Sequence, residues 1–553
     1  MRNDSQGTGN KRSPLKLVLF AAASVFVLGC LFFWLWLWPM LGPLYFSPQY
    51  MTTMREAVKL WNVDRARSKD LLEKAAQSCQ GSNASIAEKL RFFREYARFL
   101  YANQEDSEGD RQIERAVTLV KGDPPPGSAE ADELTHAYQD RGWSLHDRYL
   151  VAPKNADPGL QDQEKSVAVA EKAFGADHEQ TVYKIPSLSV IYGDIGQPEK
   201  ADALMKRALT AVDTNAGAKQ CAWFVYAMAA RLNAVEHNYK EGLKYFLKAR
   251  SVSSDDSQRE RAWTEFRLGL THEKSRAEKA QAETARLFSK NKFEELDQIG
   301  DRLLKSQEQT AQGKWALDDF ITELAGENSG DTSGLVQHIY TLKNWLKKNS
   351  RSVSARVALA QAQIKYGWQL HGNNHDNVTE AKKKLLIEHV TEAQSLLDAV
   401  PGIKKTTPAA CTVYLRVAVG LHKDKAAVLK IIDETHRLWP NYHNIDWWAT
   451  YFLMPFWYGD HGESAANIEK LADAVGGARG DELYAQLAWF RWDDEDDEEY
   501  MMSAKQWQRF KKGFARILAD FPHDMKARIE FIKFALRYKD ESSMEHIFDS
   551  FSL

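Results

Sequence analysis

Residues 174–208 read FGADHEQTVYKIPSLSVIYGDIGQPEKADALMKRA and predict two antiparallel helices joined by a tight turn. The apolar residues that we expect in the interface of this pair are separated by 4, 9, 4 and 3 positions: Leu188, Tyr192, Ala201, Met205 and Ala208. Such spacing places bulky side chains of one helix opposite small side chains of the other. Residues that favour turns lie between the two halves, at Gly193, Asp194, Gly196 and Pro198. The stretch therefore predicts a helical hairpin.

The spacing and the turn together resemble the tetratricopeptide repeat (TPR). The leading Gly-Ala-Asp-His, residues 175–178, is similar to the longer repeat of kinesin light chains. The resemblance implies an array of stacked helical pairs, in which each pair buries its apolar face against its neighbours. It also implies a surface that holds a protein or peptide, and it names no partner.

Segments on both sides of this hairpin have the same helical pattern, with little of the alternation that strands show. Apolar and small residues match the repeat at Leu72, Ala75, Phe93, Ala97, Leu100, Ile113, Ala116, Gly242, Phe246 and Ala249. A longer unit at 129–173 contains a polar loop at 153–161, and the prolines of KGDPPPG at 121–127 separate two units. We therefore expect an α-solenoid of TPR-like hairpins over residues 49–288. Its binding surface would be the groove lined by the first helix of each pair, and its last part, residues 259–288, a charged helical connection.

The region at 289–553 contains a different set of phrases. In chain order these are FEELD at 293–297, GKWAL at 313–317, ARVALA at 355–360, YGW at 366–368 and LMPFWYGDHGE at 453–463. Together they resemble a bacterial domain family of unassigned function, over about residues 290–475. The chain departs from that family at Ser352, where the family has a proline. The resemblance implies no activity, and we expect irregular helical pairs packed as a second array.

Residues 454–463 form the best candidate ligand site, because three aromatic rings lie beside two acids and a histidine. Such a mixture is suited to a sugar or a peptide, and the candidate ligand residues are Trp457, Tyr458, Asp460, His461 and Glu463. A paired-carboxylate mechanism requires Asp460 and Glu463 to face one cleft. The alternative is a connection between two helices, in which Trp457 fills the core and one of the acids caps the next helix. The helical pattern that follows at 464–475 favours this alternative.

The N-terminal residues 17–38 are almost wholly apolar, and no charged residue occurs between Lys16 and Arg55. A helix of this length spans roughly 33 Å, enough for the core of a bilayer. Basic residues precede the span at Arg2, Lys11, Arg12 and Lys16. By the positive-inside rule we predict a cytoplasmic segment at 1–16, a single transmembrane helix at 17–38, a location in the inner (cytoplasmic) membrane and an exported C-terminal region. A cleaved signal peptide and a lipoprotein attached at Cys30 are the alternatives, and large aromatic residues that continue past Gly29 disfavour both.

Composition and motifs exclude several classes of function. The net charge of −3 provides no basic field for nucleic acid. The four cysteines, Cys30, Cys79, Cys221 and Cys411, lie far apart and predict neither a disulfide framework nor a zinc site. The chain contains no P-loop, no GxGxxG at a strand-to-helix turn and no GxSxG. We therefore predict no cofactor, no metal site and no catalytic residue.

Three functions follow from these patterns. The leading hypothesis is a non-catalytic, single-pass membrane-anchored scaffold that binds a protein or peptide partner in its groove. The second is a carbohydrate-directed or hydrolytic domain that uses residues 454–463 and is displayed on a repeat stalk. The third is self-association of the array into a membrane-bound homo-oligomer.

Overall fold

The computed structural model describes residues 49–61, 63–151, 156–271, 276–327, 332–372, 378–493 and 502–549. These residues form helices joined by turns and short loops, and the one β-bridge among them joins Gln309 to Trp315. The chain divides into two compact units, of which the first ends at Phe266 and the second begins at Arg267. The described part of the chain is therefore all-α, as the sequence predicts.

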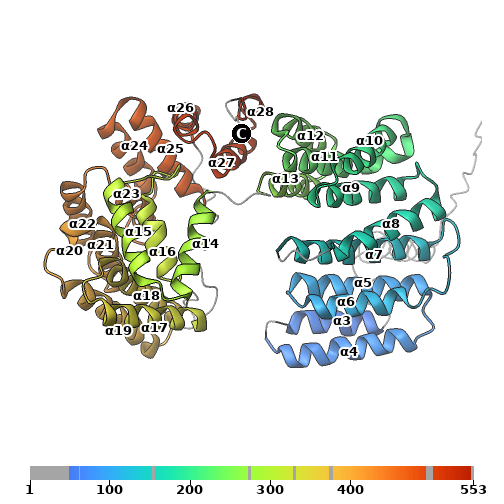
Figure 1. The fold of residues 1–553 in the computed structure, drawn as a ribbon, viewed down its shortest axis with the longest axis horizontal. Coiled ribbons are helices and arrows are strands. Elements are labelled where there is room, and N and C mark those ends of the chain that lie inside the picture. Colours follow the sequence, from blue (N-terminus) through green and yellow to red (C-terminus); the bar gives the residue numbers. More distant parts are fainter. Residues whose placement is uncertain are drawn as a thin grey trace, which may run out of the picture. The chain divides into compact units, whose positions relative to one another are not determined.

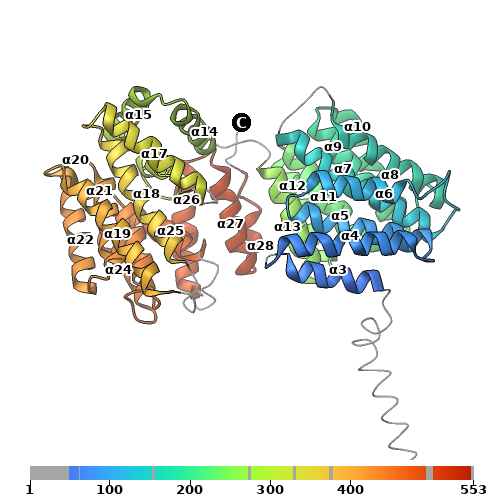
Figure 2. The same ribbon diagram turned by 90° about the horizontal axis from the view of Figure 1, so that it is seen from below.

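The first unit is built from sequential helical pairs, coloured blue to green in Figure 1. Its α-helices are α3 (Gln49–Leu60), α4 (Arg65–Gly81), α5 (Ile86–Ala102), α6 (Asp106–Val117), α7 (Ala129–Val151), α8 (Pro158–Phe174), α9 (Glu179–Asp194), α10 (Pro198–Thr214), α11 (Ala222–Val235), α12 (Tyr239–Val252) and most of α13 (Asp256–Leu270), within which the division between the units falls. Each of the helices α3, α5, α7, α9 and α11 packs against the helix that follows it, and α5, α7, α9 and α11 also pack against one another in sequence (Figure 2). The first unit is therefore an α-solenoid of TPR-like hairpins.

The hairpin predicted at 174–208 is confirmed. α9 ends at Asp194 and α10 begins at Pro198. Gly196 in the turn has a φ of 75°, a conformation that a residue without a Cβ adopts at little cost. Pro198 occupies the first turn of α10, where its missing N–H sacrifices no helical hydrogen bond. All five residues that the spacing placed in the interface are buried, with at most 7% of their surface exposed.

The other positions that match the repeat also lie in the core. Nine of them are at most 1% exposed: Leu72, Ala75, Phe93, Ala97, Leu100, Ile113, Ala116, Phe246 and Ala249. The tenth, Gly242, lies where α12 crosses α11 closely. A Cβ at this position would be 3.0 Å from the carbonyl oxygen of Ala230 and 3.1 Å from the ring of Phe266. The small residues of the pattern thus set the distance between helices.

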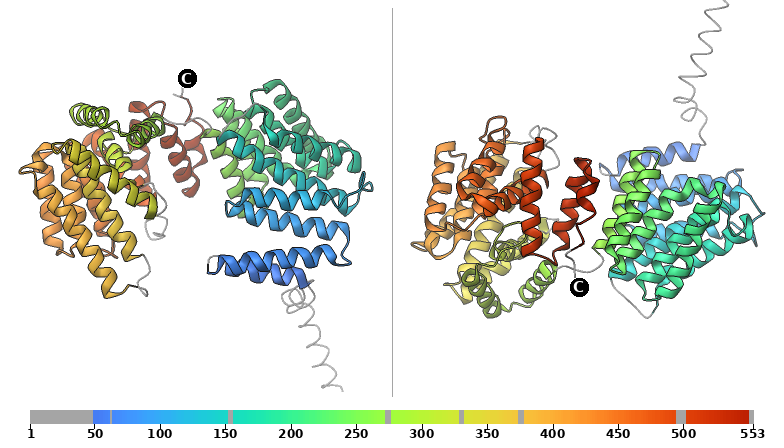
Figure 3. Two further views of the ribbon diagram at one scale, coloured as in Figure 1. Left: turned by 60° about the horizontal axis from the view of Figure 1, so that its bottom comes forward. Right: turned by 90° about the horizontal axis from the view of Figure 1, so that it is seen from above.

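The second unit contains less regular pairs, coloured yellow-green to red in Figure 3. Its helices are α14 (Arg276–Ser289), α15 (Phe293–Ser306), α16 (Ala316–Leu324), α17 (Thr332–Lys348), α18 (Val353–His371), α19 (Glu380–Asp398), α20 (Ile403–Thr406), α21 (Pro408–Gly420), α22 (Lys425–Leu438), α23 (Asn444–Phe452), α24 (Glu463–Val475), α25 (Gly477–Asp493), α26 (Ala504–Asp520), α27 (Met525–Arg537) and α28 (Glu541–Met544). The most extensive packing joins α18 to α19 and α25 to α26.

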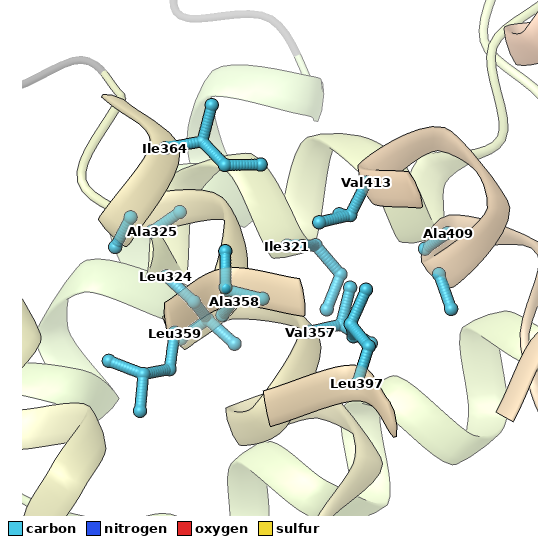
Figure 4. Packing of buried hydrophobic residues seen from close by; sticks show 14 of the residues in the cluster. Ile321, Leu324, Ala325, Val357, Ala358, Leu359, Ile364, Leu397, Ala409 and Val413 are labelled. Carbon is cyan, nitrogen blue, oxygen red and sulfur yellow. The ribbon is translucent and has the colours of Figure 1, made fainter. Parts of the chain in front are cut away.

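A large apolar cluster holds α14 to α23 of the second unit together. Figure 4 shows its centre, where side chains from α16, α18, α19 and α21 meet. The labelled members are Ile321, Leu324, Ala325, Val357, Ala358, Leu359, Ile364, Leu397, Ala409 and Val413. The alanines allow close approach of the helices, and the branched residues fill the space between them.

The division between the units falls earlier than the domain boundary predicted at 289. The first unit ends at Phe266, whereas α14 packs against α15 and α16. Leu287 and Phe288, at the end of α14, belong to the apolar cluster of the second unit. Most residues in 259–288 are polar or charged, so the sequence does not indicate that these two apolar residues join the core of the second unit. The sequence alone therefore assigns α14 to the first array.

The predicted membrane localisation is corrected by the structure. Among the described residues, no helix is both long enough and apolar enough to cross a bilayer. The predicted span at 17–38 and the predicted cytoplasmic segment at 1–16 lie outside the described residues. The assignment to the inner membrane, with an exported C-terminal region, therefore has no supporting helix and is withdrawn.

Candidate functional site

The predicted ligand loop, residues 454–463, connects α23 to α24 in the second unit. Backbone hydrogen bonds fold it into a compact turn: the N–H of Trp457 donates to the carbonyl of Met454 (3.0 Å) and that of Tyr458 to the carbonyl of Phe452 (3.1 Å). Gly459 is required at this turn, because a Cβ would lie 1.8 Å from the carbonyl oxygen of Leu453. The local sequence thus specifies the turn itself.

The aromatic residues of the loop differ in their surroundings. Trp457 is half-buried and meets the rings of Phe452 (5.5 Å between centroids) and Trp368 (6.0 Å) edge to face. Tyr458 is also half-buried against the core of the second unit, whereas Phe456 is 65% exposed. Trp457 therefore packs against the core of the second unit, which is closer to the helix-connection alternative than to an exposed ligand platform.

The acidic residues of the loop do not form a matched pair. The carboxylate of Glu463, at the start of α24, accepts hydrogen bonds from Nζ of Lys425 (2.6 Å) and from the backbone N–H of Asp460 (2.9 Å). These contacts, the one from Lys425 foremost, lower the pKa of Glu463. The side chains of Asp460 and His461 are exposed. The loop has the geometry of a helix connection, and ligand binding by its five candidate residues stays a prediction.

Replacing Glu463 with alanine should destabilise the second unit by about 1 kcal/mol, because the hydrogen bonds from Lys425 and from the backbone N–H of Asp460 are lost together with a negative charge in the first turn of α24. The stabilisation by Glu463 is present above the ordinary pKa of a glutamate and is lost as pH falls through its lowered pKa in the folded state. Urea unfolding at neutral and acid pH measures both effects. Asp460→Ala is the matched control, because this exposed side chain should contribute little. Equal losses in the two variants would contradict this role of the Glu463 contacts.

A second candidate site lies in the first unit, on the surface formed by α5, α7, α9 and α11, which we call the first-helix face. On α7, five residues at spacings of 4, 4, 3 and 4 share one side of the helix: Asp132, His136, Asp140, Trp143 and Asp147. This spacing matches the 3.6-residue period of an α-helix. Asp140 of this stripe lies 3.9 Å from Arg94 and from Arg98 of α5, which packs against α7.

A cavity of about 650 Å³ opens between the C-terminal end of α5, the first residue of α6 and the C-terminal half of α7. Two aromatic residues, three acids, one hydroxyl and one base line it: Tyr101, Trp143, Asp106, Asp140, Asp147, Ser144 and Arg148. Its size lies within the range of ligand pockets in proteins. The cavity combines apolar ring surface with an excess of carboxylates.

The single base of the cavity is already neutralised. Arg148 donates to the carboxylate of Asp110 at 2.6 Å, and the hydroxyl of Tyr101 donates to the same carboxylate at 3.0 Å. Among the described residues, Asp147 takes part in no hydrogen bond or ion pair, and Asp140 lies 3.9 Å from Nε of both Arg94 and Arg98. The carboxylates that line the cavity therefore outnumber its bases, and neither Asp140 nor Asp147 accepts a hydrogen bond from a described residue.

Loss of solvation affects these two carboxylates. Burial raises the pKa of Asp140, although Arg98 and Arg94 act in the opposite direction. The same loss of solvation raises the pKa of Asp147, which Arg231 partly offsets. A carboxylate with a raised pKa gains most from a cation placed beside it.

Buried charges behind the cavity fix the position of Trp143. His146, one turn further along α7, is fully buried between Asp157 (Nδ1 to Oδ2, 2.6 Å) and Asp194 (Nε2 to Oδ2, 3.0 Å). Arg231 of α11 lies 3.4 Å from Asp194, and its guanidinium carbon is 4.9 Å from the centre of the Trp143 ring. These contacts join α7, α9 and α11 beneath the first-helix face.

The sequence did not predict this site, although one pattern in the sequence indicates it. The 4, 4, 3, 4 spacing of polar and aromatic residues at 132–147 can be read from the printed chain. Such a stripe is typical of any solvated helix face. Only the packing of α5 beside α7 turns it into the wall of a cavity.

Comparisons with known proteins yield no family. No family model and no curated protein matches the chain. Among solved structures, the chain is similar to a chain in a structure of Naa15/Naa10 bound to HypK-THB, with 14% sequence identity, a TM-score of 0.19, and coverage of 91% of this chain and 94% of that chain. The description as a TPR-like helical repeat protein therefore rests on the stacked helical pairs themselves.

Proposed function

We propose that this protein is a non-catalytic scaffold whose first-helix face binds a peptide segment of a partner protein. The cavity beside Trp143 is the anchor of that interaction. The observation that carries the proposal is the cavity itself, which holds two rings and several carboxylates on a surface shared by consecutive repeats.

General properties of repeat arrays support the proposal. Stacked helical pairs form extended surfaces that suit an extended segment of a partner. Binding energy at such surfaces concentrates in a few pockets, and tryptophan and tyrosine are enriched there. The ring of Trp143 is held from behind by Arg231, so little conformational freedom is lost when a ligand packs against it.

The test is selection of peptides from a displayed random library against the full chain. We expect a set of peptides that bind the wild type and lose about tenfold or more in affinity with Ser144→Trp, because the larger side chain fills the cavity. Fluorescence anisotropy of synthetic peptides measures the loss. Gln77→Trp is the matched control, since Gln77 is exposed on α4 and does not line the cavity.

Circular dichroism spectra of both variants should equal that of the wild type. The proposal fails if no selected peptide distinguishes Ser144→Trp from Gln77→Trp. It also fails if both variants weaken binding equally, because the peptides then bind elsewhere on the surface.

A further inference from the structure

We infer that the side chain received by the cavity beside Trp143 is an arginine of the partner peptide. This inference rests on the proposed function and goes further, because it names the chemistry of the partner. Three observations support it: the charge of the cavity, the aromatic rings that line it, and the distances from the neighbouring arginines to Asp140.

The charge of the cavity favours a cation. Asp106, Asp140 and Asp147 line it, against the single base Arg148, which is paired to Asp110. Asp147 makes no hydrogen bond or ion pair with a described residue. An incoming acidic side chain would meet like charges, and an apolar one would bury these carboxylates without compensation.

The rings favour a guanidinium in particular. Arginine stacks on aromatic faces and donates in parallel to carboxylates, whereas the ammonium of lysine is a compact point charge. Trp143 already holds the guanidinium of Arg231 at 4.9 Å, and Arg231 in turn pairs with Asp194 and Glu265. The fold thus contains one example of the arrangement that we infer for the ligand, a guanidinium lying over this ring with acids at its edge.

The arginines of α5 that lie near the cavity do not occupy the hydrogen-bonding positions of Asp140. Arg94 forms an ion pair with Glu133 at 3.1 Å, and its distance to Asp140 is longer, at 3.9 Å. Arg98 is exposed and is likewise 3.9 Å from Asp140. At 3.9 Å neither contact is a hydrogen bond, so the lone pairs of Asp140 remain available to a closer donor.

Three displayed peptide libraries that differ only at a central position test the inference. That position is arginine in one, norleucine in the second and glutamate in the third, and the flanking positions are random. Each library is selected against the full chain, and binders are then measured on wild type and Ser144→Trp. We expect binders that depend on the cavity to come from the arginine library, and citrulline in place of the arginine to weaken them about tenfold or more.

Protein variants provide the complementary test. Asp147→Asn should weaken the arginine peptides by several-fold, and the double change of Asp140 and Asp147 to asparagine by roughly tenfold. The single variant changes a side chain that makes no hydrogen bond or ion pair with a described residue, so it keeps its fold even if the double variant does not. Asp202→Asn, an exposed acid on α10, removes the same charge away from the cavity and should leave binding unchanged.

The possible failures are distinct. If no library yields peptides that lose binding in Ser144→Trp, the proposed function fails. If peptides that depend on the cavity come from the norleucine or glutamate library, the proposed function stands and the arginine inference is wrong. Arginine peptides that tolerate citrulline, or that bind Asp147→Asn and Asp202→Asn equally well, also overturn the inference.

Discussion

Replacing His146 with alanine is expected to lower the free energy of unfolding of the first unit by about 3–5 kcal/mol, the usual loss when one partner of a buried ion pair is removed. The ring of His146 is fully buried and is hydrogen-bonded to two carboxylates, those of Asp157 and Asp194, which are themselves at most 1% exposed. Without the imidazole, both carboxylates lose a buried partner. Asp194 retains the cation Arg231 at 3.4 Å, whereas Asp157 retains the neutral backbone N–H of Gly159 (2.8 Å), so the larger penalty falls on Asp157.

The pH dependence of this stabilisation follows from the pKa of His146. Burial by itself lowers that pKa, but the hydrogen bonds to Asp194 and Asp157 outweigh burial and raise it above the ordinary value. The folded state therefore holds the proton more tightly than the unfolded state. The stabilisation is fully present below about pH 6.5, the ordinary pKa of histidine, and is lost as pH rises through the pKa of the folded state. The His146→Ala variant should lack this dependence.

Urea unfolding followed by hydrogen–deuterium exchange measures the loss and locates it. Exchange should increase first in α7, α8 and α9, which the His146 contacts join. His546→Ala is the matched control, because His546 forms a 2.7 Å pair with Asp549 while 79% of its side chain is exposed. An exposed pair contributes less than about 1 kcal/mol. Similar losses in the two variants would contradict the role assigned to His146.

Replacing Trp315 with alanine is expected to destabilise the second unit by about 3–5 kcal/mol, through the cavity that it leaves in the core. Trp315 is 1% exposed, and its ring meets that of Tyr442 edge to face at 5.2 Å. Its indole N–H donates to the carbonyl of Asn441 (3.1 Å), and its backbone N–H donates to the side chain of Asn444 (2.7 Å). One residue thus fixes the start of α16 against the start of α23.

A second substitution separates packing from hydrogen bonding at this position. Trp315→Phe keeps most of the ring volume but leaves the carbonyl of Asn441 without its donor, which costs about 1–2 kcal/mol. Chemical denaturation of both variants provides the comparison, with Phe456→Ala as the control for loss of an exposed ring. If Trp315→Ala lies within about 1 kcal/mol of the wild type, the side chain does not hold the unit together.

The hairpin at 174–208 could be predicted because its determinants are local. The spacing from Leu188 to Ala208, the glycine at 196 and the proline at 198 specify two helices and their turn, and the structure places each as expected. α9 nevertheless also buries polar residues that no apolar pattern anticipates. Lys184 is fully buried, and its Nζ donates to Oε1 of Gln139 on α7 at 3.1 Å. Burial lowers the pKa of Lys184 to about 7.

The loop at 454–463 shows the limit of local reasoning about a site. Its composition is compatible with a ligand site and with a helix connection, because both use rings and acids, and only the helical pattern that follows at 464–475 favours the connection. The position of Trp457 against Phe452, and of Glu463 against Lys425, depends on helices that lie outside the loop. The cavity beside Trp143 shows the opposite error. Its residues are polar, so the sequence predicts a solvated helix face where the structure has a cavity.

The sequence by itself determined the helical pairs, their turns and the small residues at their interfaces, because these depend on contacts within one repeat. The tertiary structure alone decided which polar residues are buried, where a cavity opens and which unit α14 belongs to. These features depend on partners that are distant in the chain: His146 and Asp194 are 48 positions apart, and Trp315 and Asn444 are 129 apart. Helix periodicity specifies which face of a helix is apolar, whereas only the stacking of helices specifies which charged groups meet.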